Sequence, residues 1–380
     1  MRTKRSITIN NSFVHGICNC SCVTCHINKP TYQGPKTTQT REMVQTIADR
    51  VREAEREGLY IRAIGNSGDG EPTLHPEFAD RMAIFGDLIR NWRSDRHPAP
   101  DVCIVTNGLK LSDPEIIRSL VENRISLKIS FPTSNPEHYA QIMQPVNQAS
   151  GPELFQDLMP ALENVMKLKR QGHFPRLEFH VSPPYYEHLY PDFPATVEFL
   201  AEMAGRQGLA DVNLKMFPVL ANRGGTVKGP KQRLELYHDY FKRFNNRRIH
   251  GVRVNMFYSY DFFYPNLSYL FDLWRAFDYP CLWFGNIYLS PFGESGCPND
   301  QSVEDPEGNI LTHSLREIME IKETRIPGPV CKACNQKPWF LARLGILPLF
   351  HWAAARKWRR HGAVAQRRGR PLYAKRAERA

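Results

Sequence analysis

The chain has 380 residues, 42% of them hydrophobic and 23% charged, so it can bury a sizeable core and is not globally disordered. Its formal net charge of +11 at first suggests a nucleic-acid binder. The last forty residues, however, carry eleven Lys and Arg against one acidic residue, so the rest of the chain is nearly neutral. No stretch of eighteen apolar residues occurs, which argues against a membrane span.

Residues 6–218 alternate strand-like and helix-like patterns. The predicted strands are 6–13, 59–64, 102–106, 127–131, 177–181 and 212–217. The predicted helices are one that Thr40 caps and Gly58 ends, followed by 77–92, 113–122, 153–171 and 195–206. Strands that alternate with helices pair in parallel, so the pattern predicts an α/β fold with a sheet covered by helices.

Nine cysteines fall mostly into two clumps, and the first residues lack the apolar core of a signal peptide. We therefore expect a cytoplasmic, reducing setting in which cysteines bind metal rather than form disulfides. Cys18, Cys22 and Cys25 form a C-x3-C-x2-C frame. Three thiolates on one short loop can hold three irons of a [4Fe–4S] cluster and leave the fourth iron open. A zinc knuckle completed by His15 or His26, or incidental cysteines, are the alternatives.

Two cysteines of the chain are predicted to bind no metal: Cys20, caught inside the loop, and Cys103, a buried strand thiol. The second clump contains four further thiols, which are Cys281, Cys297, Cys331 and Cys334. Four thiolates can close a complete iron–sulfur cluster, and a tetrahedral zinc site is the alternative.

The chemistry-bearing residues follow the predicted strands, and in parallel sheets chemistry gathers at the carboxyl ends of the strands. The cysteine loop follows the first strand, and a glycine-rich loop, 65–72, follows the second. Thr106–Gly108 follows the third strand, Ser130 ends the fourth, and Phe217–Val219 ends the sixth. The glycine-rich loop is either an ordinary turn or a binding edge, since an open backbone beside a carboxylate can bind an ammonium group.

These motifs together resemble the radical S-adenosylmethionine (SAM) superfamily over about residues 8–220, and the late cysteines resemble its auxiliary-cluster extension, called SPASM or, in a shorter form, twitch. The resemblance implies a partial (β/α)6 TIM-like barrel followed by a small cysteine-rich domain. It implies that Cys18, Cys22 and Cys25 hold a [4Fe–4S] cluster whose open iron is chelated by SAM. The SAM contacts that it implies are Asp69, Gly70, Glu71 and Pro72 at the amino group, Ser130 at the ribose or carboxylate, and Phe217 and Val219 at the adenine.

The family's activity implies an enzyme that reductively cleaves SAM to a 5′-deoxyadenosyl radical, which takes a hydrogen atom from a substrate. A low-potential donor such as flavodoxin or ferredoxin would supply the electron, and an auxiliary [4Fe–4S] cluster would accept one from the substrate. Peptide modification and oxidation of a sugar or small polyol both remain open, and the sequence assigns no catalytic residue. A non-catalytic zinc or iron–sulfur protein that binds nucleic acid is the alternative.

We divide the chain into a barrel (1–220), an aromatic-rich linker (221–280), an auxiliary-cluster domain (281–338) and a basic tail (339–380). Residues 237–284 contain seventeen of the forty-two aromatic residues, which either pack the linker or form a substrate wall with Asp261 and Arg275 as polar anchors. The tail begins with an interrupted apolar stretch followed by arginines. It suits an anionic membrane surface or RNA, or it is simply solvated.

Overall fold

Alternating apolar residues build a central sheet whose strands are mostly parallel. The structure, a computed structural model, describes residues 6–23, 25, 36–67, 70–181, 192–216, 239–258, 285–296 and 308–325. The six predicted strands are confirmed as β1 (Ser6–Ser12), β4 (Tyr60–Ser67), β5 (Asp101–Thr106), β6 (Ser126–Ser130), β7 (Leu177–Val181) and β8 (Asp211–Met216). Each pairs in parallel with the next, so their carboxyl ends form one edge.

The sheet extends beyond these six strands at both sides. β10 (Val252–Tyr258) pairs in parallel with β8, and β11 (Asn286–Leu289) pairs in parallel with β1. Two short antiparallel strands, β9 (Arg247–Ile249) and β12 (Ser295–Gly296), complete the order β12-β11-β1-β4-β5-β6-β7-β8-β10-β9. The six strands predicted within residues 6–218 are thus extended by β10 and β11, which lie in segments that the sequence analysis assigned to the linker and to the auxiliary domain.

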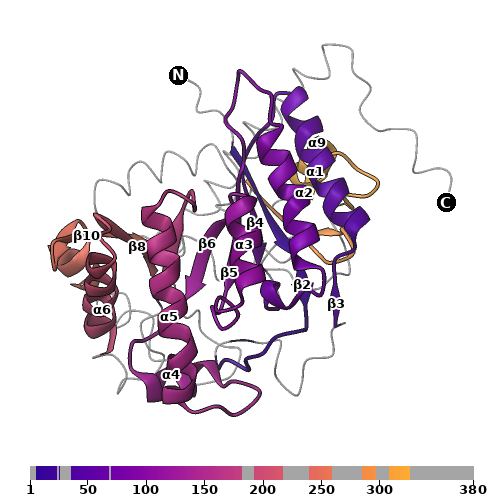
Figure 1. Ribbon diagram of the computed structural model, residues 1–380. Helices are drawn as coiled ribbons and strands as arrows, with labels where there is room; N and C mark the ends of the chain where they lie inside the picture. Colours follow the sequence, from indigo (N-terminus) through magenta and orange to yellow (C-terminus); the bar gives the residue numbers. More distant parts are fainter. Residues whose placement is uncertain are drawn as a thin grey trace, which may run out of the picture.

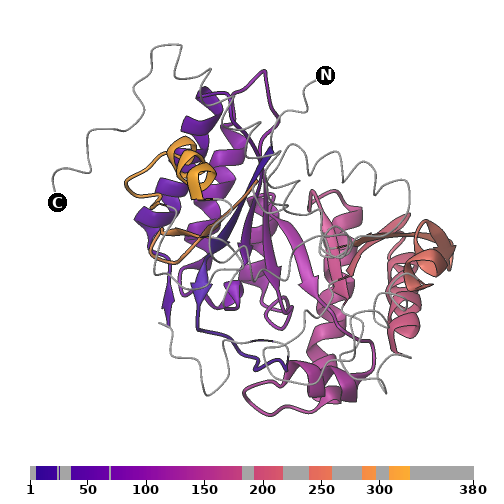
Figure 2. The ribbon, with the colours of Figure 1, turned by 180° about the vertical axis from the view of Figure 1, so that it is seen from behind.

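Five predicted helices are confirmed, and they cover one side of the sheet (Figures 1 and 2). They are α1 (Arg41–Arg56), α2 (Phe78–Arg90), α3 (Pro114–Glu122), α5 (Gly151–Arg170) and α6 (Asp192–Arg206). Thr40 caps α1 as predicted, since its side chain accepts a hydrogen bond from the Met43 N–H. α9 (Leu315–Arg325) packs on α1, where Arg316 forms an ion pair with Glu57 at 2.8 Å.

A helix that the sequence analysis did not predict, α4 (Pro136–Met143), lies at the carboxyl end of β6 (Figure 1). Asn135 caps it by accepting a hydrogen bond from the His138 N–H, and Pro136 occupies its first turn. His138 Nδ1 also contacts Asp192 at 2.6 Å, which ties α4 to the start of α6. The carboxyl end of α4 also contacts the cysteine loop of the candidate site.

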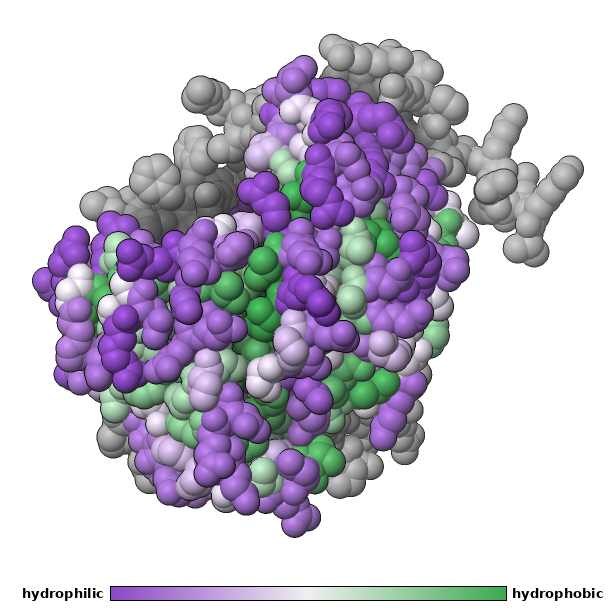
Figure 3. All heavy atoms as spheres, viewed as in Figure 1, coloured by the Kyte–Doolittle hydropathy of each residue, from purple (hydrophilic) through white to green (hydrophobic). Residues whose placement is uncertain are grey.

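The hydrophobic core lies between the sheet and these helices. The sheet contributes residues such as Ile129, Phe179 and Leu214, all fully buried, and α1 contributes its apolar stripe. The outward faces of the helices are mainly hydrophilic, with hydrophobic side chains visible between them (Figure 3). No helix in the described ranges is long and apolar enough to cross a membrane. The basic tail lies outside the described residues, so its membrane or RNA contact stays a prediction.

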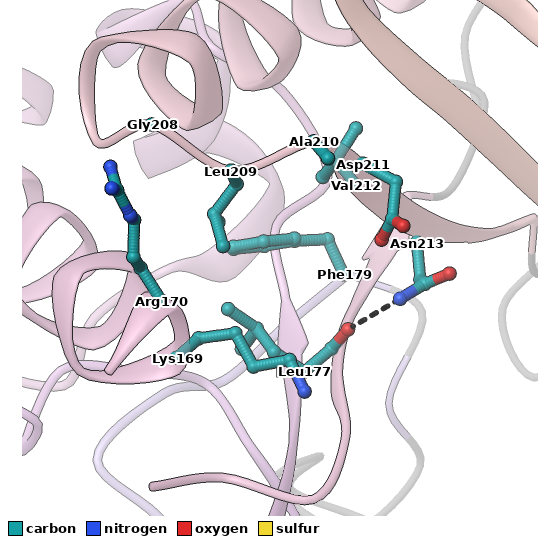
Figure 4. A pocket seen from close by; sticks show the side chains of 10 residues that line it. All are labelled: Lys169, Arg170, Leu177, Phe179, Gly208, Leu209, Ala210, Asp211, Val212 and Asn213. Atoms are coloured by element: carbon teal, nitrogen blue, oxygen red, sulfur yellow. Dashed lines mark hydrogen bonds between the residues drawn. The ribbon is translucent and has the colours of Figure 1, made fainter. Parts of the chain in front are cut away.

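A cavity of about 360 Å³ opens at the amino-terminal ends of β7 and β8, between α5 and the loop after α6 (Figure 4). This end of the strands is opposite to the carboxyl end at which α4 lies. Two of the polar side chains around it are engaged within the chain: Asn213 donates to the Leu177 carbonyl at 3.3 Å, and the Lys169 ammonium donates to the Phe174 and Pro175 carbonyls. This cavity is therefore not the candidate site.

The packing of α4 on α5 makes a testable prediction at Gly151. A Cβ built on this residue would fall on the Pro136 carbonyl group, so Gly151→Ala must push the two helices apart. We expect the free energy of unfolding to fall by about 1–3 kcal/mol, measured by urea denaturation. Gln156→Ala, at an exposed position of α5, is the control and should change it by less than about 0.5 kcal/mol. Equal values for the two variants would contradict this packing.

Candidate functional site

The candidate site lies at the carboxyl edge of the sheet, where the cysteine loop leaves the first strands. β1 is followed by β2 (Val14–His15), which pairs with β3 (Thr37–Thr38). In both ribbon views the chain after β2 then runs along this edge toward α4 (Figures 1 and 2). Its three predicted iron ligands therefore lie where chemistry is expected in a parallel sheet.

A short ladder holds the cysteine loop against the end of α4. The N–H groups of Ser21 and Val23 donate to the carbonyls of Gln144 and Ile142, at 2.7 and 2.9 Å. Val146 donates back to the loop at Asn19, at 3.0 Å. The Met143 sulfur also lies 3.8 Å from the Cys22 sulfur. Residues 142–146 thus fix the backbone that carries Cys18 and Cys22.

The glycine-rich loop after β4 docks on the other end of the cysteine loop. The Glu71 N–H donates to the Ile17 carbonyl at 2.9 Å. A Cβ at Gly70 would lie 2.7 Å from the carbonyl oxygens of both Val14 and Ile17, so only glycine fits this close approach of two backbones. The two loops that carry the predicted cluster and SAM contacts are therefore packed directly together.

The Glu71 carboxylate is buried and links three segments. One oxygen accepts hydrogen bonds from the Thr73 N–H and hydroxyl and from the Thr106 hydroxyl, at 3.1, 2.7 and 2.7 Å. The other accepts from the Asn107 N–H at 2.7 Å. Burial raises the pKa of this carboxyl, and the four hydrogen bonds oppose that rise. Its acceptor sites are thus used inside the protein, which makes Glu71 a residue that positions the loop.

A buried amide network lies beneath the two loops. Asn11 of β1 donates to Gln39 and to Asn66 of β4, both at 2.8 Å, and Gln39 donates back to Asn11 at 2.6 Å. His75 Nε2 reaches the Gln39 carbonyl at 2.9 Å, and burial lowers the pKa of His75, which keeps its imidazole neutral. This network joins the ends of β1 and β4 before the loops begin.

The thiols themselves are partly or fully enclosed. Burial, together with the nearby Glu71, Cys22 and Cys25, raises the pKa of the Cys18 thiol to about 12, although the Cys20 N–H opposes the rise. A thiol with so high a pKa ionises only beside a strong positive charge, and a bound iron ion would supply that charge. Cys20 is fully buried, as expected for a thiol inside the loop, and Cys103 is confirmed as a buried strand thiol.

A single metal ion and a multi-iron cluster require different arrangements of their thiol ligands. Within the residues that the structure describes, no three Cys, His, Asp or Glu side chains converge closely enough to hold one metal ion. A zinc ion needs that convergence because all its ligands bind one atom. In a [4Fe–4S] cubane each thiolate binds a different iron, so the thiolates lie further apart. Cys18, Cys22 and Cys25, three thiols on one short loop, are a donor set of the kind that such a cluster uses.

The face of the sheet opposite the helices carries charged groups on β6, β7 and β8. Strand alternation places Lys128, Glu178, His180 and Lys215 on this face, and the register sets Lys128 beside Glu178 and His180 beside Lys215. His180 Nε2 lies 2.9 Å from the Glu178 carboxylate, and both side chains are buried. The interior of a closed barrel is normally packed with apolar residues, so this polar wall of four side chains departs from the usual pattern.

Burial and the neighbouring charges determine the protonation states of His180 and Glu178. Burial and the positive Lys215 and Lys128 lower the pKa of His180 to about 4, against the opposing effect of Glu178. Burial would raise the pKa of Glu178, but the His180 hydrogen bond and the two lysines outweigh it and hold that pKa low. At neutral pH the pair is thus a neutral imidazole bonded to a carboxylate.

The structure places the predicted site residues as follows. It brings together Cys18, Cys22, Gly70 and Glu71, with Pro72 starting the 3₁₀ turn η1 (Pro72–Leu74) and Cys25 closing a turn on the Cys22 carbonyl at 2.9 Å. Ser130 ends β6 on the same edge, beside His180. The remaining predictions lie outside the described residues: Asp69, Phe217, Val219, Cys281, Cys297, Cys331 and Cys334.

Sequence reasoning missed two parts of the site. The segment 142–146 was not predicted because α4 was not, although the Asn135-Pro136 pair is a typical helix start. The sequence analysis predicted the strand 177–181 but did not single out Glu178 and His180. The alternation of these two residues with Leu177 and Phe179 could have indicated a polar face on this strand.

Comparison with known proteins identifies the class of the fold. Residues 13–174 match the sequence model of the Radical SAM superfamily. The chain is similar to the structure of native anSMEcpe with bound AdoMet, at 16% identity and a TM-score of 0.60, with 86% of each chain covered. It is also similar to Streptococcus suis SuiB bound to S-adenosylmethionine, at 13% identity and a TM-score of 0.56, over 88% of this chain and 71% of that one.

A second SuiB structure, bound to the precursor peptide SuiA, matches at 11% identity with a TM-score of 0.54, over 83% of this chain and 65% of that one. A comparison with curated proteins found no match. The chain thus has an α/β, partial TIM-barrel-like fold that is similar to these structures, and residues 13–174 match the Radical SAM superfamily model.

Loss of the Glu71 carboxylate tests the link between the loops. Glu71→Ala leaves buried donors of Thr73, Thr106 and Asn107 without their acceptor, so we expect the free energy of unfolding to fall by about 3 kcal/mol or more. Urea denaturation measures this loss. Glu115→Ala, which removes an exposed carboxylate paired with the exposed Arg118, is the control and should cost less than about 1 kcal/mol. A similarly small loss for Glu71→Ala would contradict the proposed link.

The buried His180 predicts a pH dependence of stability. Its folded pKa lies below the unfolded value of about 6.5, so below pH 6.5 the unfolded chain binds a proton that the folded chain refuses. Stability contributed by neutral His180 is therefore lost as the pH falls from about 6.5 to about 4. His180→Gln should flatten this part of the profile, by at most about 3 kcal/mol. Urea denaturation across this range measures it; the exposed His173→Gln should leave the slope unchanged, and an equal slope in His180→Gln would refute the prediction.

Proposed function

We propose that the protein is a radical SAM enzyme, in which Cys18, Cys22 and Cys25 hold a [4Fe–4S] cluster and SAM binds beside it. The observation that carries this proposal is the direct docking of the Gly70–Glu71 backbone on the cysteine loop. When bound, the reduced cluster supplies the electron that cleaves SAM into methionine and a 5′-deoxyadenosyl radical, which takes a hydrogen atom from the substrate.

The chain's own residues would bind and orient SAM. Because the Glu71 carboxylate is used internally, the backbone at Asp69 and Gly70 is the part of this loop that we propose to meet the SAM amino group. Ser130, at the end of β6, would contact the ribose or carboxylate. Phe217 and Val219 would contact the adenine, as the resemblance implies for the end of the sixth strand.

The late cysteines are proposed to hold an auxiliary [4Fe–4S] cluster. Their four thiolates, Cys281, Cys297, Cys331 and Cys334, are a complete ligand set. β11, which begins five residues after Cys281 in the sequence, pairs with β1, the strand that precedes the cysteine loop. The cluster would accept an electron from the substrate, and flavodoxin or ferredoxin would reduce the first cluster.

The substrate is proposed to be a peptide or a small polyol or sugar. The polar wall of Lys128, Glu178, His180 and Lys215 supports a substrate with hydrogen-bonding groups, since few well-placed polar groups orient a ligand in a pocket. The likeness to SuiB, which has been solved with its precursor peptide, supports the peptide alternative. The four auxiliary cysteines, which resemble the shorter twitch form, support the polyol alternative.

The cysteines provide a matched test of the activity. We expect anaerobically reconstituted protein with SAM and a strong reductant to form 5′-deoxyadenosine, measured by chromatography. Replacing Cys18, Cys22 or Cys25 by alanine should abolish the product, because each would bind one iron of the cluster. Cys20→Ala and Cys103→Ala remove buried thiols of the same region and should retain activity and iron.

Metal analysis separates the alternatives. Two complete clusters give about seven to eight irons per chain with matching sulfide, whereas zinc at both sites would refute the proposal. Absence of 5′-deoxyadenosine from protein with intact clusters, with and without candidate peptides and polyols, would also refute it. About four irons would refute the auxiliary cluster alone.

A further inference from the structure

Asn107 is buried at the point where β5 ends and three segments of the site meet. Its N–H donates to the Glu71 carboxylate at 2.7 Å, and its carbonyl accepts from the Tyr139 hydroxyl at 3.3 Å. Tyr139 belongs to α4 and is fully buried. The backbone of Asn107 is thus held from both the glycine-rich loop and α4.

The side-chain amide of Asn107 is also fixed in orientation. Its oxygen accepts a hydrogen bond from the Leu109 N–H at 3.0 Å, so its NH₂ group faces the cysteine loop. There the nitrogen donates to the Asn19 side-chain oxygen at 2.6 Å. It also lies 3.6 Å from the Cys20 sulfur and 4.0 Å from the Cys18 sulfur, so the positive end of the amide dipole faces the thiol predicted to bind iron.

A second donor reaches the same sulfur. The Cys20 N–H lies 3.4 Å from the Cys18 sulfur, and the Asn107–Asn19 bond fixes the loop in this conformation. Donors beside a ligating sulfur stabilise negative charge on it. Because a reduced iron–sulfur cluster carries one more negative charge than the oxidised one, such donors raise its reduction potential.

We infer that Asn107 is a positioning residue that raises the reduction potential of the cluster held by Cys18, by directing its amide N–H groups at Asn19 and at the Cys18 sulfur. This inference rests on the proposed function. It assigns to the end of the third predicted strand a role in electron uptake, separate from the binding of SAM by the glycine-rich loop.

An EPR-monitored redox titration of the reconstituted full-length protein tests the inference. Asn107→Asp keeps the shape of the side chain but replaces the donor by a negative charge. At a fixed solution potential we expect the ratio of reduced to oxidised cluster to fall about tenfold, which is about 59 mV for one electron. Asn107→Leu removes the donor without adding charge and should shift the ratio in the same direction by less.

Asn123→Asp is the matched control. This asparagine is also buried, but its amide donates to the Ser119 carbonyl at the end of α3, at 2.8 Å. At the same solution potential, this variant should leave the ratio of reduced to oxidised cluster within twofold of the wild-type ratio, even if it lowers the stability of the protein.

The outcomes separate this inference from the proposed function. Wild-type protein that forms no [4Fe–4S] signal would refute the proposed function. Full cluster content with an unchanged ratio in both Asn107 variants would refute the inference and leave the function intact. If Asn107→Asp prevents cluster assembly, Asn107→Leu decides alone, and an unchanged or raised ratio in that variant refutes the inference.

Discussion

The burial of one carboxylate, that of Glu71, is the constraint on which the candidate site depends. A buried charge is unfavourable unless hydrogen bonds satisfy it, and here four donors from Thr73, Thr106 and Asn107 do so. These donors come from η1 and from the end of β5, while the Glu71 N–H holds the cysteine loop. Glu71 thus joins three segments: its side chain binds η1 and the end of β5, and its N–H binds the cysteine loop.

The cysteine loop is held from two sides. The glycine-rich loop contacts its start at Ile17, and the 142–146 segment pairs with residues 19–23. α4 is in turn fixed by its packing on α5 and by the His138–Asp192 contact. If Cys18 and Cys22 bind a cluster as proposed, a loop held in this way limits the conformational entropy lost on binding.

Much of the central sheet could be predicted from sequence, because regular periodicity identifies strands and helices wherever one face packs on a core. The cap at Thr40 and the stripe of α1 are examples. β10 and β11 could not be predicted as barrel strands, since a strand pattern does not name its partner and theirs are remote in sequence. The cysteine motif predicted where the candidate site lies, but the contacts of Glu71 and Asn107 depend on tertiary packing that no spacing reveals.

The pairing of β11 with β1 also bears on how the protein is made. β1 is an interior strand of the finished sheet, with β4 on one side and β11 on the other, yet residues 8 and 286 meet in this pairing. During synthesis, one edge of β1 therefore stays open until about 280 further residues have been made. Such a late, non-local pairing is slow to form and leaves an unpaired strand edge exposed to the wrong partners. The strand that leads into the cysteine loop is consequently among the last parts of the sheet to be enclosed.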